Sequence, residues 1–296
     1  MIEHLHQTPE SPARVVALGA SGFVGGALVS HLRGLGVDTV PLSSSDVDLC
    51  RPESVDLLKN RLRKDDALVF ISALTPDRGR DIRTLMKNLA MGEHVCEALS
   101  ASPCAHVVYV SSDAVYADDV NPVRETSCCS PSGFHGLMHL AREQMLSFTL
   151  VKSGTPLLIL RPSLLYGAKD THNGYGPNRF LRQARGGQPV TLFGQGEEKR
   201  DHVHVEDVAR LIGLGLTHRS RGALNVATGA SVSFMDAARA IFERLGVEAN
   251  LNCLPRSQPI THRHFDVALT HRAYPSFVYT SLTDGLAKTL SDLNNL

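Results

Sequence analysis

A glycine triplet directly behind an apolar run constrains this 296-residue chain more than any other feature. Residues 14–20 read RVVALGA, the unbroken apolar pattern of a buried strand, and the following residues have a helical period. Gly19, Gly22 and Gly25 occupy the junction. Glycine permits a tight turn and the close approach of a backbone, and the free N–H groups of the following helix bind phosphate. The junction therefore predicts a dinucleotide-binding βαβ unit.

The same alternation of short apolar runs and helical patterns continues along the chain. We predict further strands at 38–42, 67–73, 106–112, 156–162 and 223–229, and helices at 53–63, 81–100, 132–146, 204–216 and 233–246. Strands that are apolar throughout, separated by helices, indicate a parallel sheet covered on both faces. The predicted fold is therefore α/β, a Rossmann-like doubly wound parallel sheet with a smaller C-terminal domain.

The pattern changes near residue 170. Residues 168–202 are rich in Gly, Asn, Arg and Gln and have only short apolar runs, which indicates a loop-rich insertion within a cap. We expect a dinucleotide-binding Rossmann domain over 12–170, to which segment 203–230 returns. Residues 171–296 would then form mainly a substrate-binding cap. No stretch has the composition of a flexible linker, so the two parts should form one interleaved unit.

Composition narrows the classes of partner. Thirty basic residues balance thirty acidic ones, which argues against a nucleic-acid-binding protein. No run is long and apolar enough to predict a membrane span, and the first sixteen residues do not resemble a signal peptide. Six cysteines without a CxxC pair indicate reduced thiols and no zinc cluster. We therefore expect a cytoplasmic protein that binds neither nucleic acid nor membrane.

Several motifs together point to one family. GASGFVG at 19–25 is joined by VSSDAVY at 110–116, LRPSLLYG at 160–167, RDHVHVEDVA at 200–209 and TSLTDGLAKTL at 280–290. In these segments the chain resembles the extended short-chain dehydrogenase/reductase family, in its NAD-dependent epimerase/dehydratase branch that acts on nucleotide sugars. The resemblance implies a Rossmann domain that holds NAD or NADP and a smaller domain that holds the nucleotide sugar. It also implies a possible homodimer paired through two Rossmann helices.

Two histidines occupy the positions of the family's catalytic pair. In the family, a Ser or Thr after the fourth strand acts with a Tyr-x-x-x-Lys pair, and Ser112 matches the serine. With Gly136 and Glu143 in register, His135 stands at the tyrosine position and His139 at the lysine position. Imidazole, with a reference pKa of about 6.5, accepts a proton at neutral pH without a cationic helper. We predict that His135 moves a proton at a sugar hydroxyl, that His139 donates to a ribose hydroxyl, and that activity titrates at about pH 6–7.

Three other interpretations of the histidines stay open. The first is loss of catalysis, which would leave a non-catalytic dinucleotide- and sugar-nucleotide-binding protein, a partner subunit or sensor. The second is a shared metal, which histidines one turn apart allow. No third ligand is evident in the sequence, so we expect no metal. The third is a pair of solvated side chains on the surface of a helix.

The residue after the serine narrows the reaction. In family 4,6-dehydratases an Asp-Glu pair follows the Ser/Thr, whereas here Asp113 is followed by Ala114. The acid is present and the base is absent, which argues against elimination of water. Two reactions remain: epimerisation through a transient ketone, and reduction of a 4-keto sugar. Asp113 either protonates a reacting group or caps the turn. The predicted function is an NAD(P)-dependent nucleotide-sugar epimerase or 4-keto-sugar reductase.

The resemblance also indicates where the cofactor lies. The expected cofactor-binding residues follow the predicted strands and are Gly19, Ser21, Gly22, Phe23, Val24, Gly25, Ser43, Ser44, Asp48, Leu49, Ala73, Leu74, Thr75, Asn88, His139, Pro162 and Leu164. The second strand ends at Leu42 and runs into three serines, with neither a carboxylate for a ribose hydroxyl nor an arginine for a 2′-phosphate. NAD and NADP are both open, with NADP slightly favoured. Asp48 is expected to accept from the adenine amino group.

The nucleotide sugar is expected to contact residues of the cap. The expected substrate-binding residues are Asn178, Arg179, Arg200 and His264. Arg200 offers a bidentate fork to a diphosphate, and a structural salt bridge is the alternative role of this side chain. The neighbours of His264 compete with it for the nucleotide.

Overall fold

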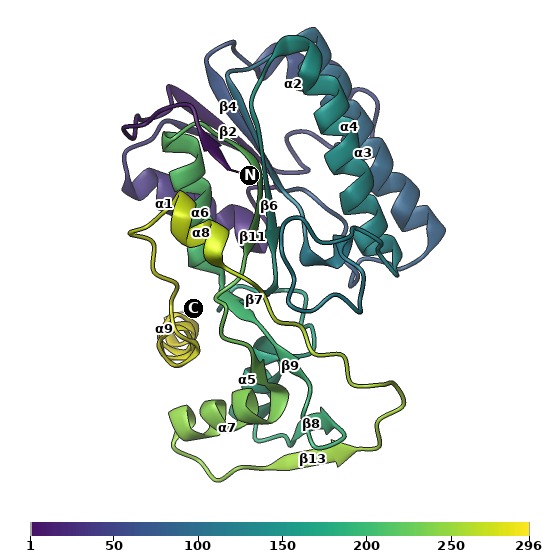
Figure 1. Cartoon of the computed structure of the whole chain (residues 1–296), viewed down its shortest axis with the longest axis vertical. Helices are drawn as coiled ribbons and strands as arrows, with labels where there is room; N and C mark the ends of the chain where they lie inside the picture. Colours follow the sequence, from purple (N-terminus) through teal and green to yellow (C-terminus); the bar gives the residue numbers. More distant parts are fainter. Residues whose placement is uncertain (1, 296) are drawn as a thin grey trace.

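A seven-stranded sheet forms the larger of two lobes in the computed structural model, which describes residues 2–295 (Figure 1). The strand order is β1 (Glu3–His4), β11 (Ser220–Val226), β6 (Leu157–Pro162), β5 (His106–Val110), β4 (Asp66–Phe70), β2 (Arg14–Leu18) and β3 (Thr39–Leu42). All neighbouring strands are parallel except β1 and β11. The strand order reverses between β2 and β4, the point at which such sheets bind ligands. The predicted Rossmann-like α/β fold is confirmed.

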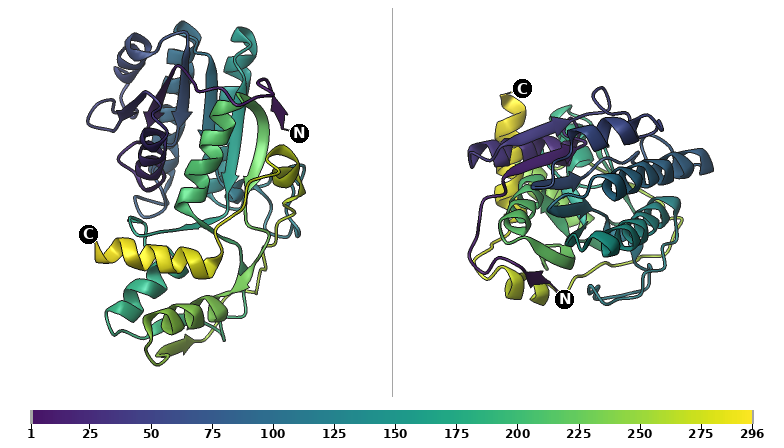
Figure 2. Two further views of the ribbon diagram at one scale, coloured as in Figure 1. Left: turned by 90° about the vertical axis from the view of Figure 1, so that its left-hand side faces the viewer. Right: turned by 90° about the horizontal axis from the view of Figure 1, so that it is seen from above.

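Helices cover both faces of this sheet, as Figures 1 and 2 show. One face carries α1 (Phe23–Gly34) and α6 (Val205–Thr217). The other face carries α2 (Ser54–Arg61), α3 (Ile82–Ala101) and α4 (Phe134–Ser153). Because both faces are covered, β4 and β5 are buried along their whole length. No helix among residues 2–295 has both the length and the apolar character that a membrane crossing requires.

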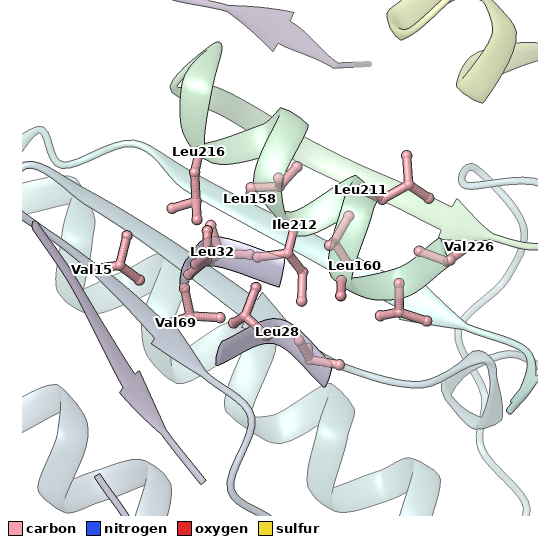
Figure 3. Packing of buried hydrophobic residues seen from close by; sticks show 14 of the residues in the cluster. Val15, Leu28, Leu32, Val69, Leu158, Leu160, Leu211, Ile212, Leu216 and Val226 are labelled. Atoms are coloured by element: carbon pink, nitrogen blue, oxygen red, sulfur yellow. The ribbon is translucent and has the colours of Figure 1, made fainter. Parts of the chain in front are cut away.

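The core between α1, α6 and the sheet fixes the start of α1. Leu28 and Leu32 of α1 pack with Ile212 of α6 over Val15 and Val69 of the sheet (Figure 3). Each is 1% exposed or less. Burial of one such side chain contributes about 1.5–3 kcal/mol. Helix α1 is therefore anchored to the strand whose end it follows.

The smaller lobe contains short strands and helices from the second half of the chain. Its elements are α5 (Pro177–Arg185), β8 (Val190–Phe193), β9 (Lys199–Arg200), β12 (Val232–Ser233), α7 (Phe234–Leu245), β13 (Leu251–Leu254) and α9 (Leu282–Asn294). Two parallel strands, β7 (Leu164–Tyr166) and β10 (His202–His204), lie where the lobes meet (Figure 1). A separate core that includes Phe180, Leu192 and Phe234 holds this lobe together.

Two features differ from the sequence analysis. The loop-rich insertion predicted over 168–202 contains helix α5, which starts at Pro177 and is followed by Gly186. Proline at a helix start and glycine after its end are ordinary boundary residues. Nine residues, however, give too few turns for a clear period. The polar lead before residue 12 contributes β1, which pairs with β11 and which the predicted domain boundary omits.

The last segment of the chain contacts both lobes. Helix α8 (Ala268–Ala273) packs near β11, and Tyr274 and Phe277 belong to the core of the sheet lobe. Helix α9 instead packs against α7 in the smaller lobe (Figure 2). Part of the segment 171–296, which is expected to be mainly a cap, thus packs on the sheet lobe.

Candidate active site

In the turn between β2 and α1, the backbone passes close to the loop after β4 and to the first turn of α1. Gly19 has φ +93°, and a Cβ there would lie 2.9 Å from the amide nitrogen of Ser72. A Cβ at Gly25 would lie 2.0 Å from the carbonyl oxygen of Gly19. Gly22 caps α1 without a side chain, and the first turn of the helix has no acidic residue. The N–H groups at this end are therefore available to an anion, and the turn fits the diphosphate of a dinucleotide.

A carboxylate lies at the carboxyl end of β3, where the sequence analysis found none. Asp46 folds back so that its Oδ2 accepts from the amide of Ser43 at 2.9 Å and from the Ser43 hydroxyl at 2.6 Å. These bonds lower the pKa of Asp46. The strand end is tied to the glycine turn, because Gly19 donates to the carbonyl of Leu42. The end of β3 therefore carries a carboxylate, the side chain that holds ribose hydroxyls in many dinucleotide sites.

The loop after β4 is held from beneath. Asn88 of α3 accepts from the amide of Leu74 at 2.9 Å and donates to its carbonyl at 3.0 Å. Arg142 of α4 donates to the carbonyl of Ser72 at 2.8 Å and to Asn88 Oδ1 at 3.1 Å. The side-chain amide of Asn88, an expected cofactor residue, is therefore hydrogen-bonded to the backbone of the loop. It holds Leu74 in the loop that the sequence analysis expects to line the cofactor.

A close helix contact places His135 near the turn after β5. A Cβ at Gly136 would lie 1.9 Å from the carbonyl oxygen of Ala114, so only glycine lets α4 start here. Ala114 belongs to the short helix η1 (Asp113–Val115). Farther along α4, buried Glu143 pairs with Arg161 at 2.6 Å. These two contacts fix the helix that carries both histidines.

His135 and His139 touch each other. Their ring centroids are 4.7 Å apart and the ring planes are nearly perpendicular, at 88°. His135 lines a cavity of about 470 Å³ together with residues of the β4 loop, α3 and the smaller lobe, which include Leu74, Asn88 and His172. His139 is 5% exposed, and its Nδ1 lies 2.7 Å from the hydroxyl of Tyr109. His139 is therefore not a solvated surface residue, whereas His135 is half-buried in the wall of the cavity.

Burial sets the protonation of both rings. Burial, with the neighbouring His172 and Arg142 adding to it, lowers the pKa of His135 to about 4. Burial, with His135 and Arg142 adding to it, also holds the pKa of His139 well below its ordinary value. Both imidazoles are neutral at pH 7 as a result. Within residues 2–295 no group of three or more His, Cys, Asp or Glu side chains is placed to hold a metal ion.

The turn after β5 carries a serine and an acid with different roles. The hydroxyl of Ser112 accepts from the amide of Ala114 at 3.1 Å and so caps η1. Asp113 instead faces Arg263, whose Nε lies 3.4 Å from Asp113 Oδ2. Burial raises the pKa of Asp113, and Arg263 and Arg200 oppose this rise. The capping role considered for Asp113 thus belongs to Ser112.

The expected substrate-binding residues have varied surroundings. Asn178 is buried and accepts from the amide of Gly167 at 3.0 Å. Arg200 forms an ion pair with Glu198 and donates to the carbonyl of Thr261, so the structural salt bridge considered for it is present. Arg179 and the ring of His264 have no such contact in the described part of the chain. They are the expected residues whose side chains are free to meet a ligand.

Three residues of the site were missed. Arg142 follows His135 and His139 at helical spacing, and this stripe could have placed it on the buried face. Tyr109 lies in a strand whose residues are all buried, so no alternation of polar and apolar residues indicates which face of the sheet its side chain occupies. Asp46 has no signal in the sequence, because a turn brings its carboxylate back to the strand end.

Comparisons with known proteins bear on the family and the fold of this chain. Residues 15–227 match the model of the NAD dependent epimerase/dehydratase family. A dTDP-4-dehydro-6-deoxy-D-allose reductase of Streptomyces bikiniensis is 24% identical over 78% of this chain and 81% of its own. An uncharacterized UDP-glucose epimerase of Bacillus subtilis (strain 168) is 24% identical over 71% of this chain and 67% of its own.

A solved structure supports the fold. The UDP-glucose 4-epimerase of Thermus thermophilus, in complex with NAD, superimposes with a TM-score of 0.82 at 20% identity. The match covers 95% of this chain and 99% of that one. At this identity the likeness establishes the fold, and the family match establishes the relationship. The chain belongs to the NAD dependent epimerase/dehydratase family.

Proposed function

We propose that the protein is an NAD-dependent nucleotide-sugar epimerase in which His135 and His139 take the positions of the tyrosine–lysine pair. The observation that carries this proposal is the pair of neutral, touching imidazoles beside a cavity whose wall continues into the β4 loop. That loop contacts the glycine turn, since Ser72 lies against Gly19. The proton-transfer groups and the cradle for a diphosphate are thus parts of one site.

The side chains supply acid–base chemistry. A bound dinucleotide would supply the hydride acceptor at the sugar carbon. Neutral His135 accepts the proton of the sugar hydroxyl as the hydride leaves the carbon, which gives a transient ketone. The protonated ring then returns its proton to the oxygen when the hydride comes back to the opposite face of the carbon. No oxidant is consumed over the full cycle.

The resting protonation state favours epimerisation over reduction. An epimerase cycle starts with an alcohol and needs a neutral base, which matches the lowered pKa of His135. Reduction of a 4-keto sugar starts with a ketone and needs a proton donor. Asp113, whose pKa burial raises, is the observation that supports the reductase as the second candidate.

The cofactor and substrate follow from the same site. The diphosphate of the cofactor fits the N-terminus of α1, and the Asp46 carboxylate suits the ribose hydroxyls of NAD. The named relatives act on UDP- and dTDP-linked sugars, and the Thermus enzyme is named as a complex with NAD. We therefore expect a UDP- or dTDP-sugar as substrate. Arg179 and His264 are the expected nucleotide contacts.

A homodimer through α3 and α4 is part of the proposal. Both helices carry large apolar side chains that are exposed in the single chain. They are Ile82 and Met86 on α3, 66% and 58% exposed, and Phe148 and Val151 on α4, 74% and 79% exposed. Exposed apolar surface of this kind favours association.

The test is turnover on a panel of UDP-, GDP- and dTDP-sugars with NAD or NADP. Product NMR detects epimers, and nicotinamide absorbance detects net reduction. We expect His135→Ala to abolish turnover. His271→Ala is the matched control, because this histidine is exposed on α8. Binding of the dinucleotide without turnover of any sugar would instead support a non-catalytic binding protein.

A further inference from the structure

The hydrogen bond between Tyr109 and His139 fixes more than the position of the ring. Tyr109 is fully buried in β5, packed against Phe70 at a ring-centroid distance of 5.4 Å. Its hydroxyl lies 2.7 Å from Nδ1 of His139. A neutral imidazole carries one ring proton, on either Nδ1 or Nε2. The direction of this one hydrogen bond therefore decides which nitrogen carries it.

The neighbours of Tyr109 settle that direction. If Nδ1–H donated to the tyrosine, the phenolic proton would need another acceptor. His139 is the acceptor found for this hydroxyl among residues 2–295. The nearby Arg142 guanidinium has only donors. The carboxylate oxygens of Glu143 accept hydrogen bonds from Ser111 and Arg161. The phenol must then donate to Nδ1, which leaves the ring proton on Nε2.

Arg142 keeps this arrangement in place. Its guanidinium is 0% exposed and lies 4.9 Å from the centroid of the Phe70 ring. It donates to carbonyl oxygens of Ser72 and Asn88 and to the Asn88 amide oxygen. It forms no ion pair with a carboxylate in the part of the chain described. The result is a fixed positive charge that discourages protonation of His139.

We propose that Tyr109 is a positioning residue that holds His139 as the Nε2–H tautomer and so leaves a neutral donor on the ring nitrogen that has no partner in the described chain. This inference rests on the proposed function, because it assigns the donor that the family's lysine would supply. Nε2 has no hydrogen-bond partner within residues 2–295 and is not sealed from solvent. A neutral N–H can therefore serve a ribose hydroxyl there without a second buried cation beside Arg142.

The test is the tautomer of His139, measured by long-range ¹H–¹⁵N NMR on the full chain with ¹⁵N-labelled histidine. His139→Gln assigns the signal. We expect Nε2–H in the wild-type protein and a mixture of tautomers in Tyr109→Phe. NAD binding, measured by calorimetry, should weaken about threefold to tenfold in that variant, as for one lost hydrogen bond. Tyr274→Phe is the control, because it removes a buried hydroxyl bonded to Ser220 instead.

The outcomes separate this inference from the proposed function. Nδ1–H or a doubly protonated ring in the wild-type protein would overturn the inference, and so would a signal unchanged in Tyr109→Phe. None of these readings requires turnover. Absence of turnover with the Nε2–H tautomer present would overturn the proposed activity alone. If Tyr109→Phe does not fold, the tautomer of His139 in the wild-type protein decides alone, because Nδ1–H or a doubly protonated ring there overturns the inference.

Discussion

The ring of His139 meets the ring of His135 edge to face, at 88° and 4.7 Å between centroids. Two imidazolium ions at this distance would repel each other strongly, so at most one of the two rings is doubly protonated and charged at a time. The ring of His139 also forms a hydrogen bond with Tyr109, whereas the ring of His135 lines the cavity. We therefore expect the ring of His135 to be the one that exchanges a proton with a ligand.

Burial should move the pH dependence of the reaction below the range that free imidazole implies. His135 acts as a base in its neutral form, and its pKa is lowered to about 4. We expect kcat/KM for the epimerisation to stay level from about pH 8 to pH 5.5 and to fall as pH approaches the lowered pKa. Rates in overlapping buffers, with circular dichroism to confirm folding, test this. A limb at about pH 6–7 would show that the ring is solvated during catalysis.

Asp46→Asn should relax the choice of cofactor. The carboxylate at the end of β3 repels the extra phosphate of NADP, and the amide does not. We expect the ratio of kcat/KM with NADP to that with NAD to rise about tenfold. Asp56→Asn is the control, because this exposed carboxylate on α2 pairs with Lys59 and is not among the expected cofactor contacts. An unchanged ratio in Asp46→Asn would place the adenosine ribose elsewhere.

Restoring the family's lysine should cost stability. His139→Lys places an ammonium in a buried position close to the Arg142 guanidinium, and we expect a loss of about 1–3 kcal/mol in the free energy of unfolding. Arg142→Met removes the second charge. In a double-mutant cycle followed by urea unfolding, the two changes together should therefore cost less than their sum. Strict additivity would mean that the two positions do not interact.

The buried histidines should make the fold sensitive to acid. Burial lowers the pKa of His106 to about 4 and that of His202 to about 3, from about 6.5 in an unfolded chain. The unfolded chain then binds more protons between these values, so the stability is fully present above pH 6.5 and is lost as pH falls toward 4. Each histidine contributes a slope of about 1.4 kcal/mol per pH unit.

Urea unfolding at pH 5, 6, 7 and 8 measures this slope. His106→Gln should flatten it, because glutamine does not titrate, whereas His271→Gln on the exposed surface should leave it unchanged. Equal stability at pH 5 and pH 7 would contradict the assignment of buried neutral histidines.

The exposed apolar side chains of α3 and α4 should mediate pairing of two copies. We expect Phe148→Glu to convert a dimer into a monomer in light scattering after size-exclusion chromatography. Val278→Glu is the control, because Val278 is 72% exposed and lies outside both helices. A monomeric wild-type protein at high concentration would contradict the proposed homodimer.

The long strands and helices of the fold could be predicted from the sequence, whereas the short elements could not. A long apolar run such as 67–73 predicts a buried strand, and a long helical periodicity such as 81–100 predicts a helix with one buried face. Strand β4 and helix α3 lie at these two places. Helix α5 was missed because nine residues, with a proline at the start, give little periodicity. Strand β1 has two residues and depends on an edge of the sheet that forms elsewhere.

The same distinction holds for the site. His135 and His139 could be placed by register against Gly136 and Glu143, and both lie on the inner side of α4. Their pKa values could not be predicted, because burial by neighbouring elements sets them. The contact of Tyr109 with His139 joins residues thirty positions apart, and only the packed sheet and helix bring them together.

Both margins of the central sheet discourage further pairing. On one side β1 is a two-residue strand that runs antiparallel to β11, and on the other Pro41 lies in β3 and has no backbone N–H. Short edge strands and edge prolines are poor templates for a strand from another molecule. We therefore expect two copies to associate through side chains and not by joining their sheets.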